Sequence, residues 1–204
     1  MKLVAMTFVS LDGVYQGPGS PDEDRSDGFS RGGWFVQYLD QVFLDQAAEW
    51  LRKAGGLLLG RRTYESFSRD WPEMNKADDP IGLMMNSLPK YVASSTLDAA
   101  AWSPSTILRG DTLKEVQALK DRDGGELQVH GSGSLAKSLL AAGMVDELRL
   151  IVAPVIVGAG HKLFADRGAA TAMRAVRNDT TPGGLNIQVF ERVGAAEYQT
   201  FVRP

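Results

Sequence analysis

Two short turns in this chain carry the residue types that proteins use to hold a phosphate. The first is Gly131-Ser132-Gly133-Ser134, which follows a predicted strand over residues 126–130 and opens a predicted helix. Short side chains leave the backbone N–H groups open at a helix N-terminus, where the peptide dipoles favour an anion. The other interpretation is a tight strand-to-helix connection with Ser134 near the cap, and the local sequence leaves both open.

The glycine turn also matches a dinucleotide-binding pattern. Residues 131–136 fit G-x-G-x-x-G/A, in which the backbone of the turn approaches a pyrophosphate. A Rossmann unit also has an acidic residue at the far end of the following strand, where it holds the ribose hydroxyls. Here Asp146 and Glu147 stand at the beginning of that strand, at the opposite edge of the sheet. The match alone is therefore a weak sign of a Rossmann site.

The second turn is Gly60-Arg61-Arg62-Thr63, which joins a predicted buried strand over residues 57–59 to a helix. Positive charge at a helix N-terminus opposes the helix dipole, so a pair of arginines there needs a reason. The arginines either extend to solvent or pair with a carboxylate, or they clamp a phosphate beside the free N–H groups. The sequence around this turn leaves both explanations open.

A pair of serines closes a further predicted strand, over residues 90–93. Taken alone, Ser94 and Ser95 are ordinary loop residues. Beside a phosphate, their hydroxyls would be additional hydrogen-bond donors. Their interpretation therefore depends on the two turns described above.

Other kinds of chemistry find little support in the residues available. His130 and His161 are the only histidines and there is no cysteine, so no metal site is predicted, although a carboxylate site stays open. The residue two before Ser132 is a histidine, so the nucleophile elbow G-x-S-x-G is absent. No Walker lysine follows the glycines, which argues against nucleotide hydrolysis.

Length and composition predict one domain over residues 1–204, because 204 residues of which 44% are hydrophobic can bury one sizeable core. A net charge of -3 gives no basic footprint, so nucleic acid is not an expected partner. The lack of cysteine is compatible with a reducing cytoplasm, where we expect the protein to work. No apolar run is long enough for a membrane span, and we interpret the first residues as a strand rather than a signal peptide.

The elements that must position these turns alternate between strands and helices. Strands are predicted over 2–9, 57–59, 90–93, 106–109 and 126–130, and helices between them begin near Asp40, Arg61 and Thr112. The predicted fold class is therefore α/β, a mainly parallel central sheet with helices on both faces. Two further strands, 173–179 and 185–192, predict a C-terminal antiparallel hairpin. The residues from Gly194 onward are either an edge strand or a tail.

A long irregular segment follows the first strand. Such a segment inside a compact domain is usually functional or disordered, and residues 12–33 could close over a site as a lid. Its acidic cluster, Asp22 to Asp24, is expected to be solvated.

Taken in this order, the pieces resemble the dihydrofolate-reductase-like superfamily. They are most similar to its riboflavin-biosynthesis reductase branch, the RibD C-terminal domain, and to stand-alone dihydrofolate reductase family proteins. The resemblance covers nearly the whole chain, and its marks lie after successive strands and in the C-terminal part. They are Ser10-Leu-Asp12-Gly13, Gly60 to Thr63, Ser94-Ser95, His130 to Ser134, Gly143 to Leu148, Pro154 and Gly158-Ala-Gly160.

The resemblance implies NADPH as the cofactor. Gly60 to Thr63 would meet the adenosine phosphates, with Arg61 or Arg62 on the 2′-phosphate and Ser94 and Ser95 beside it. Gly131 to Ser134 would hold the pyrophosphate. The missing Rossmann acid then has an explanation, because a carboxylate would repel the 2′-phosphate.

The implied function is an NADPH-dependent oxidoreductase that transfers a hydride to a small heterocyclic substrate, pteridine- or pyrimidine-like, or to a carbonyl. The alternative is a non-catalytic NADP(H)-binding or sensor module on the same fold, and a third reading is a structural partner-binding domain. We also expect a homodimer, because the apolar stretch over residues 148–158, LRLIVAPVIVG, and the hairpin after it offer a surface to bury.

The proton donor is the least constrained part of the prediction. In dihydrofolate reductases a carboxylate on the first helix faces the substrate, and counting back from the second strand reaches Leu44, next to Asp45. Asp45 is either that carboxylate or a solvated helix residue. Asp12 is a second candidate, with turn formation as its other role. If no carboxylate faces the nicotinamide, water or Tyr15 would supply the proton to a carbonyl or imine.

Overall fold

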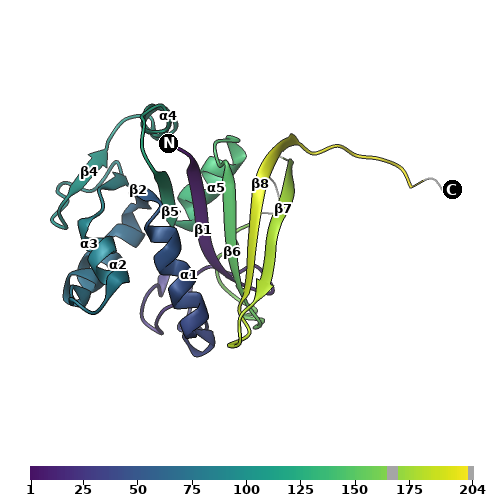
Figure 1. Cartoon of the computed structure of the whole chain (residues 1–204), viewed down its shortest axis with the longest axis horizontal. Coiled ribbons are helices and arrows are strands. Elements are labelled where there is room, and N and C mark those ends of the chain that lie inside the picture. The colour runs from purple at the N-terminus through teal and green to yellow at the C-terminus, as the bar shows by residue number, and fades with distance from the viewer. Residues whose placement is uncertain (165–169, 202–204) are drawn as a thin grey trace.

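The computed structural model describes residues 1–164 and 170–201, and in this part of the chain eight strands form one sheet (Figure 1). Their order across the sheet is β4-β3-β2-β5-β1-β6-β8-β7. The strands are β1 (Leu3–Ser10), β2 (Ala54–Gly60), β3 (Lys90–Ala93), β4 (Ser105–Leu108), β5 (Glu126–His130), β6 (Glu147–Ala153), β7 (Thr171–Thr180) and β8 (Asn186–Ala195). Neighbours from β4 to β6 pair in parallel, whereas β8 is antiparallel to both β6 and β7. The predicted mainly parallel sheet with a C-terminal antiparallel hairpin is confirmed.

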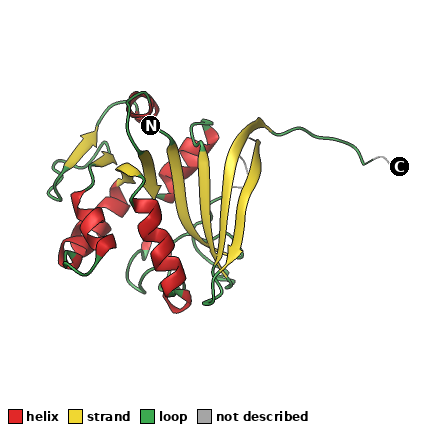
Figure 2. Ribbon diagram, viewed as in Figure 1, coloured by secondary structure: helices red, strands yellow, loops and turns green. Residues whose placement is uncertain are grey.

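Helices cover both faces of this sheet, as predicted (Figure 2). The α-helices are α1 (Gln41–Leu51), α2 (Arg61–Asp70), α3 (Pro80–Ser87), α4 (Thr112–Lys120) and α5 (Gly133–Ala141). Short 3-10 turns lie at Ser26–Gly28, Val36–Tyr38 and Trp71–Met74. Buried side chains of α4 and α5 pack on one face, and those of α1, α2 and α3 on the other. The alternation of strands and helices in the sequence therefore gives a three-layer arrangement.

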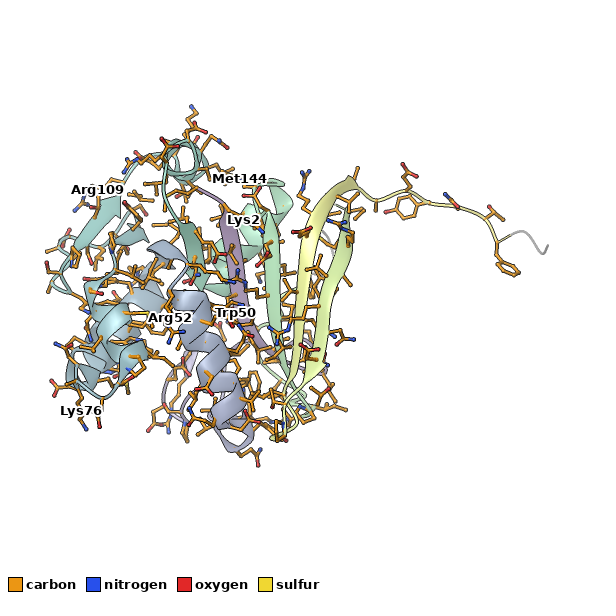
Figure 3. All side chains as sticks on the ribbon, in the orientation of Figure 1. Lys2, Trp50, Arg52, Lys76, Arg109 and Met144 are labelled. Atoms are coloured by element: carbon orange, nitrogen blue, oxygen red, sulfur yellow. The ribbon has the colours of Figure 1, made fainter. Side chains whose placement is uncertain are left out.

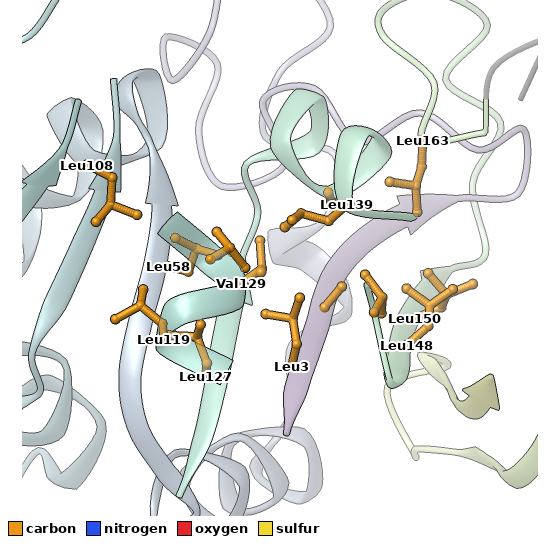
Figure 4. Close-up of a cluster of buried hydrophobic side chains, with 14 of the residues drawn as sticks. Leu3, Leu58, Leu108, Leu119, Leu127, Val129, Leu139, Leu148, Leu150 and Leu163 are labelled. Atoms are coloured by element: carbon orange, nitrogen blue, oxygen red, sulfur yellow. The ribbon is translucent and has the colours of Figure 1, made fainter. Parts of the chain in front are cut away.

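Alternating side chains of the central strands supply both layers of the core. Leu3, Leu127 and Val129 point to the face covered by α5, where they pack with Leu139 (Figure 4). The opposite face receives Trp50 from α1, which lies against the middle of the sheet (Figure 3). All five side chains are at most 3% exposed, and burial of each large apolar one stabilises the fold by about 1.5–3 kcal/mol.

The C-terminal hairpin follows the predicted turn. Thr181 N donates to Leu185 O at 2.8 Å, and Gly184 N donates to Thr181 O at 2.9 Å. The strand β8 ends at Ala195, and residues 196–201 form no strand and run away from the body of the molecule (Figure 1). Of the two interpretations of this end, the tail is the one observed.

The apolar stretch expected to form a dimer surface is used inside the chain instead. Most of it is β6, which lies between β1 and β8 and is buried along nearly its whole length. The side chains of β6 already pack in both layers of the core, so this strand does not offer the expected surface, whereas the hairpin, the other part of that expectation, is still available. Exposed apolar side chains remain at Ile156, near the end of the stretch, and at Phe164, Val176 and Val193.

The long segment after β1 is ordered around one buried amide. Gln16 is 2% exposed, and its side-chain nitrogen donates to Ser26 O at 3.1 Å while its side-chain oxygen accepts from His161 N at 3.0 Å. The indole of Trp34 donates to Gln16 O at 2.9 Å. Because a single residue links the beginning, middle and end of the segment, the loop has a defined shape.

In the part of the chain that the structure describes, no helix has the length and apolar character required to cross a membrane.

Candidate active site

A large cleft opens where β1, β2 and β5 end, at the carboxyl edge of the parallel strands, with a volume of about 1340 Å³. The side of α1, the beginnings of α2 and α5, and the loop from Tyr15 to Leu39 enclose it. Ligands of open α/β sheets bind at this edge, because the loops that follow the strands are free to form a site there. The two sequence turns described above, 60–63 and 131–134, both line this cleft.

Ser132 ties the two turns together. Its hydroxyl accepts a hydrogen bond from Gly60 N at 3.0 Å, and its own N–H donates to the Thr63 hydroxyl at 3.1 Å. Ser132 has φ of +46°, which is unusual for a residue with a side chain and is typical of strained functional turns. The cross-links hold this conformation and place the first turn of α2 beside the first turn of α5.

Two of the α-helices whose first turns line the cleft, α2 and α5, lack side-chain caps, unlike the other α-helices in the described part of the chain. Asp40, Asp79 and Asp111 cap α1, α3 and α4 by accepting bonds from first-turn N–H groups. No side chain caps α2 or α5. Open N–H groups and the positive ends of two helix dipoles therefore face one cavity, which suits a ligand with several phosphates.

The two arginines of the second turn point to different places. Arg61 forms an ion pair with Glu65 at 3.0 Å and lines a smaller pocket of about 310 Å³ next to the cleft, together with Ser94 and Ser95. Arg62 donates instead to the hydroxyl of Ser26 in the first loop, at 3.3 Å. The structure thus brings one arginine and both predicted serines together, and it directs the other arginine to the loop.

Tyr15 lies directly over the glycine turn. A Cβ added to Gly133 would overlap the Tyr15 ring. This glycine was expected to leave room for a pyrophosphate, but in the structure it leaves room for an aromatic ring. Lys137 and His161 flank the same ring, with the lysine nitrogen 5.6 Å from its centre and the histidine ring stacked at 6.2 Å. Tyr15 is therefore the part of the first loop that closes on α5.

The first loop also brings carboxyl groups to the cleft. Glu23 and Asp24 line it and are partly buried, whereas Asp22 is exposed. Burial raises the pKa of Glu23, although its side chain accepts a bond from Gly19 N at 2.5 Å. The expectation that the whole acidic cluster is solvated is therefore wrong for Glu23 and Asp24. No local signal distinguishes Glu23, because the fold of the loop decides which way it points.

Two of the proposed catalytic residues do not reach the cleft. Asp12 accepts bonds from the Ser10 hydroxyl at 2.7 Å and from Val157 N and Gly158 N at 3.0 and 2.9 Å, which lower its pKa to about 2. It organises the loop after β6. Asp45 is exposed on α1 and accepts from the Gln41 side chain at 2.8 Å.

The α1 side of the cleft is apolar instead. Leu44, the residue that the count from the second strand reaches, lines the cleft, and Asp45 is rotated away because consecutive helix residues point about 100° apart. The other α1 side chains that face the cleft are Phe43, Ala47 and Leu51. Beside them Phe8 stacks on Phe35, with ring centres 4.1 Å apart, and both rings contact Phe43 edge-on, at 5.7 and 5.9 Å.

Two polar side chains on the floor of the cleft were not singled out by sequence as site residues. Thr7 is 2% exposed and lines the cleft, and its hydroxyl has no partner among the described residues. His130 ends β5 beside Gly131, and its ring lines the same floor. Burial and the charge of Arg149 lower the pKa of His130 to about 4, so its ring is neutral at physiological pH. The Thr7 hydroxyl and the neutral ring of His130 can therefore each form a hydrogen bond with a ligand.

The described residues contain no group of three or more histidine, aspartate or glutamate side chains arranged to hold a metal ion.

Comparisons with known proteins show which family this chain matches. The family model described as the RibD C-terminal domain matches residues 1–186. The uncharacterized protein YyaP of Bacillus subtilis (strain 168) is 28% identical over 186 residues, covering 90% of this chain and 91% of that protein.

Solved structures show the same fold. A putative riboflavin biosynthesis protein from Shewanella sp. PV-4 has a TM-score of 0.65 at 19% identity, covering 95% of this chain and 99% of its own. Dihydrofolate reductase from Enterococcus faecalis, complexed with NADP(H), has a TM-score of 0.57 at 16% identity, covering 94% and 96%. The deaminase/reductase of Thermotoga maritima has a TM-score of 0.62 at 12% identity, covering 94% of this chain and 56% of that one. At these identities the similarity shows the fold alone.

Proposed function

The chain belongs to the RibD C-terminal domain family, and from that premise we propose that it is an NADPH-dependent reductase, which transfers a hydride to a small heterocyclic or carbonyl substrate. The observation that carries the proposal is the pair of uncapped helix N-termini, cross-linked by Ser132, that open into one cleft. Such a pair can bind the phosphates of a dinucleotide through backbone N–H groups. NADPH, when bound, supplies the hydride.

The residues present fit this cofactor at two points. The amides that begin α5, at Gly133 and Ser134, have no hydrogen-bond partner among the described residues and would hold the pyrophosphate. Arg61, with Ser94 and Ser95 in the smaller pocket, would hold the 2′-phosphate. A guanidinium and two hydroxyls offer the charge-assisted donors that a phosphate dianion prefers. Arg62 would instead keep the first loop in place through Ser26.

The apolar wall of α1 constrains the substrate. No carboxylate of the described part of this helix faces the cleft, so a reaction that needs a helix carboxylate, as in folate reduction, is disfavoured. A pyrimidine-like ring or an imine or carbonyl fits better, because the stacked Phe8 and Phe35 offer a flat apolar surface and the proton can come from another element.

That other element is the first loop. Tyr15 and Glu23 both line the cleft, and each can give a proton after hydride transfer. The raised pKa of Glu23 keeps its carboxyl group protonated to a higher pH than that of an exposed glutamate. The loop also covers the cleft and would exclude water from the reacting atoms.

The test is a pair of titrations followed by a substrate panel. Nicotinamide fluorescence should show tighter binding of NADPH than of NADH. NADPH oxidation is then followed by the loss of the absorbance of the reduced nicotinamide. The substrates offered are pterins, aminopyrimidinones, and small aldehydes and imines. Equal affinity for both cofactors would contradict the Arg61 assignment. Binding without oxidation of NADPH by any of these classes would favour the alternative, a sensor module.

We also propose that the protein is a homodimer and that it works in the cytoplasm. The support is now the outer edge of β7, which pairs only with β8 among the described strands, and the exposed Val176 and Val193 on the same hairpin. An exposed strand edge with apolar side chains is a common association surface. Light scattering after size exclusion should give twice the monomer mass, and a monomer mass at all concentrations would contradict the proposal.

A further inference from the structure

A buried row of polar side chains runs under α1 and ends at the cleft floor. Glu126, Gln128 and His130 alternate along β5 and point to the same face of the sheet. Gln128 is 0% exposed, and Arg149 of β6, 3% exposed, forms an ion pair with Glu126 at 2.8 Å. Most buried polar groups are hydrogen-bonded, so their partners indicate the state of each group.

The orientation of the Gln128 amide follows from its partners. One of its two terminal atoms lies 2.7 Å from Trp50 O and 2.7 Å from a carboxylate oxygen of Glu126. Both partners are acceptors only, so that atom must be the NH₂ group. The amide oxygen therefore points the other way, to His130 Nε2 at 3.0 Å.

This orientation decides the tautomer of His130. An amide oxygen can only accept, so Nε2 of His130 must carry the hydrogen. The ring is neutral at physiological pH, as its pKa of about 4 requires, and a neutral imidazole has one N–H. Its Nδ1 is then a bare acceptor. Among the described residues no hydrogen bond reaches Nδ1, and this atom is not among their buried unpaired atoms.

Charge at the far end of the row fixes the arrangement. Arg149 donates to Glu126 at 2.8 Å and to Glu147 at 2.6 Å, and Lys2 donates to Glu147 at 2.7 Å. Glu126 is thus held as a carboxylate acceptor, which keeps the Gln128 NH₂ group turned toward it. Turning Gln128 over would place its oxygen against Glu126 and Trp50 O, which are both acceptors.

We propose that His130 is a specificity-determining residue whose Nδ1 accepts a hydrogen bond from an N–H or O–H group of the substrate, and that Gln128 is the positioning residue that fixes this tautomer. The substrate class is a heterocycle with an amino or lactam N–H near the bond that is reduced. The inference deepens the proposed reductase function and rests on it for the meaning of the ligand, but the tautomer itself can be measured without any cofactor.

The first experiment reads the tautomer directly. Histidine labelled with ¹⁵N gives separate signals for protonated and bare ring nitrogens, and His130 is identified by comparison with His130→Asn. At pH 7 we expect hydrogen on Nε2 and none on Nδ1. A ring with hydrogen on Nδ1, or a doubly protonated ring, would overturn the proposal whatever the protein reduces.

The second experiment uses two probes of one shape, 2,4-diaminopyrimidine, which offers N–H donors, and 2,4-dimethylpyrimidine, which offers none. We expect the diamino probe to bind about ten times more tightly and to shift the Nδ1 signal. A tenfold ratio of affinities corresponds to a difference in binding free energy of about 1.4 kcal/mol. Equal affinity of the two probes, or binding that leaves the Nδ1 signal unchanged, would overturn the proposal.

Paired variants separate the two ring nitrogens. His130→Gln keeps a group near Nε2 that can bond Gln128 but removes the acceptor, so the probe ratio should fall to about one. His130→Asn keeps an acceptor near the position of Nδ1 and should keep most of the ratio. NADPH affinity should stay within about threefold of wild type in both variants, because His130 is proposed to bind the substrate and not the cofactor (a threefold change is well below the tenfold that corresponds to about 1.4 kcal/mol). A loss of NADPH affinity with an unchanged probe ratio would mean that the cofactor, and not the substrate, uses Nδ1.

The outcomes are independent of the proposed function. If wild type binds neither NADPH nor NADH, the reductase proposal fails while the tautomer and the probe ratio still stand or fall by themselves. Thermal unfolding checks each variant, and should His130→Gln unfold, Gln128→Met tests the same point. Without the amide oxygen the Nε2 hydrogen is no longer fixed, so a mixture of tautomers is expected, and a pure Nε2–H tautomer in that variant would contradict the role of Gln128.

Discussion

The two ends of the cleft are built in different ways. The phosphate end relies mostly on backbone: two four-residue turns, joined by Ser132, expose N–H groups at the start of α2 and α5. The ring end consists of side chains from several elements, with Phe8 of β1, Phe43 and Leu44 of α1, and His130 of β5. Residues close in sequence make the first end, whereas residues far apart make the second.

The difference separates what the two ends can discriminate. Backbone N–H groups recognise any phosphate at the right distance, so we expect the phosphate end to hold a common cofactor. A side chain such as His130, whose donor and acceptor atoms we infer to be fixed by buried neighbours, would distinguish one ring substituent from another. Variants at the two ends should therefore affect different measurements, cofactor affinity at one and turnover or substrate choice at the other.

The largest effect is expected at the phosphate end, from Gly133→Val. The new side chain would displace Tyr15 and fill the space above the turn. NADPH affinity should fall about 100-fold or more, which corresponds to about 2.7 kcal/mol, measured by nicotinamide fluorescence.

Gly60→Ala is the matched control at the other turn. Its Cβ would lie 3.7 Å from Ser132, an ordinary contact, so affinity should stay within about threefold. If both variants bind NADPH like wild type, the turns are not the phosphate site.

At the ring end, Glu23→Gln should reduce kcat about 100-fold while cofactor affinity stays unchanged, since general acids contribute about that much. Burial raises the pKa of Glu23, and the acid form is the one that gives a proton, so kcat should fall as pH rises through that pKa. In the variant this descending limb should disappear.

Tyr15→Phe is the competing variant on the same loop. A loss of the descending limb in Tyr15→Phe and its survival in Glu23→Gln would assign the proton to the tyrosine instead. The pH profile of kcat with the best substrate of the panel distinguishes the two.

Arg61→Ala should lower the preference for NADPH over NADH about tenfold, because one charge-assisted contact contributes about 1.5–3 kcal/mol. Arg62→Ala is its neighbour control, and it should leave the preference unchanged because Arg62 bonds Ser26 of the loop. Equal losses of NADPH and NADH affinity in Arg61→Ala would show that the arginine does not meet the 2′-phosphate.

Asp12→Asn acts on neither end directly and should lower stability by about 1 kcal/mol, or about 2–4 °C in Tm. The pKa of Asp12 in the folded protein is about 2, below its ordinary value of 3.8. Its contribution is therefore present above pH 3.8 and is lost as pH falls toward 2. A wild-type and variant difference in Tm that does not shrink between pH 4 and pH 2 would contradict this role.

The smallest effect is expected from Asp45→Asn. Its carboxylate is exposed and bonds only Gln41 among the described residues, so kcat/KM should change less than about twofold. A large loss of kcat would show that the carboxylate of Asp45 takes part in the reaction. The distinction between an apolar α1 wall and an acidic loop would then be wrong.

Local patterns were enough to predict the fold and the two turns that line the cleft. Strand and helix periods gave the sheet with its hairpin, and the glycines, arginines and serines of the turns were named because contiguous residues form them. The role of Asp45 was left open between a substrate carboxylate and a solvated helix residue, because one residue along a helix turns a side chain by about 100°. Sequence cannot supply that register from a neighbouring strand.

The ring end depends on facts that no short pattern contains. Glu23 faces the cleft because Gln16 gathers the loop around itself, and the state of His130 depends on Gln128, whose amide is oriented by Glu126 and a backbone carbonyl of α1. The Gln16 bond spans ten residues of a long loop, and the bond from Gln128 to Trp50 O joins β5 to α1. Such links become visible only when the elements are in place.

The position of β1 has a consequence for how the chain comes to be folded. This first strand lies between β5 and β6, pairing Leu3 with Leu127 and Val4 with Glu147. Its partners are made long after it, so the centre of the sheet forms only when most of the chain has left the ribosome, at about 5–20 residues per second. Contacts this distant in sequence slow folding. Until then the most buried strand is an exposed apolar segment, and the cleft, whose floor is β1 and β5, does not exist in any shorter nascent chain.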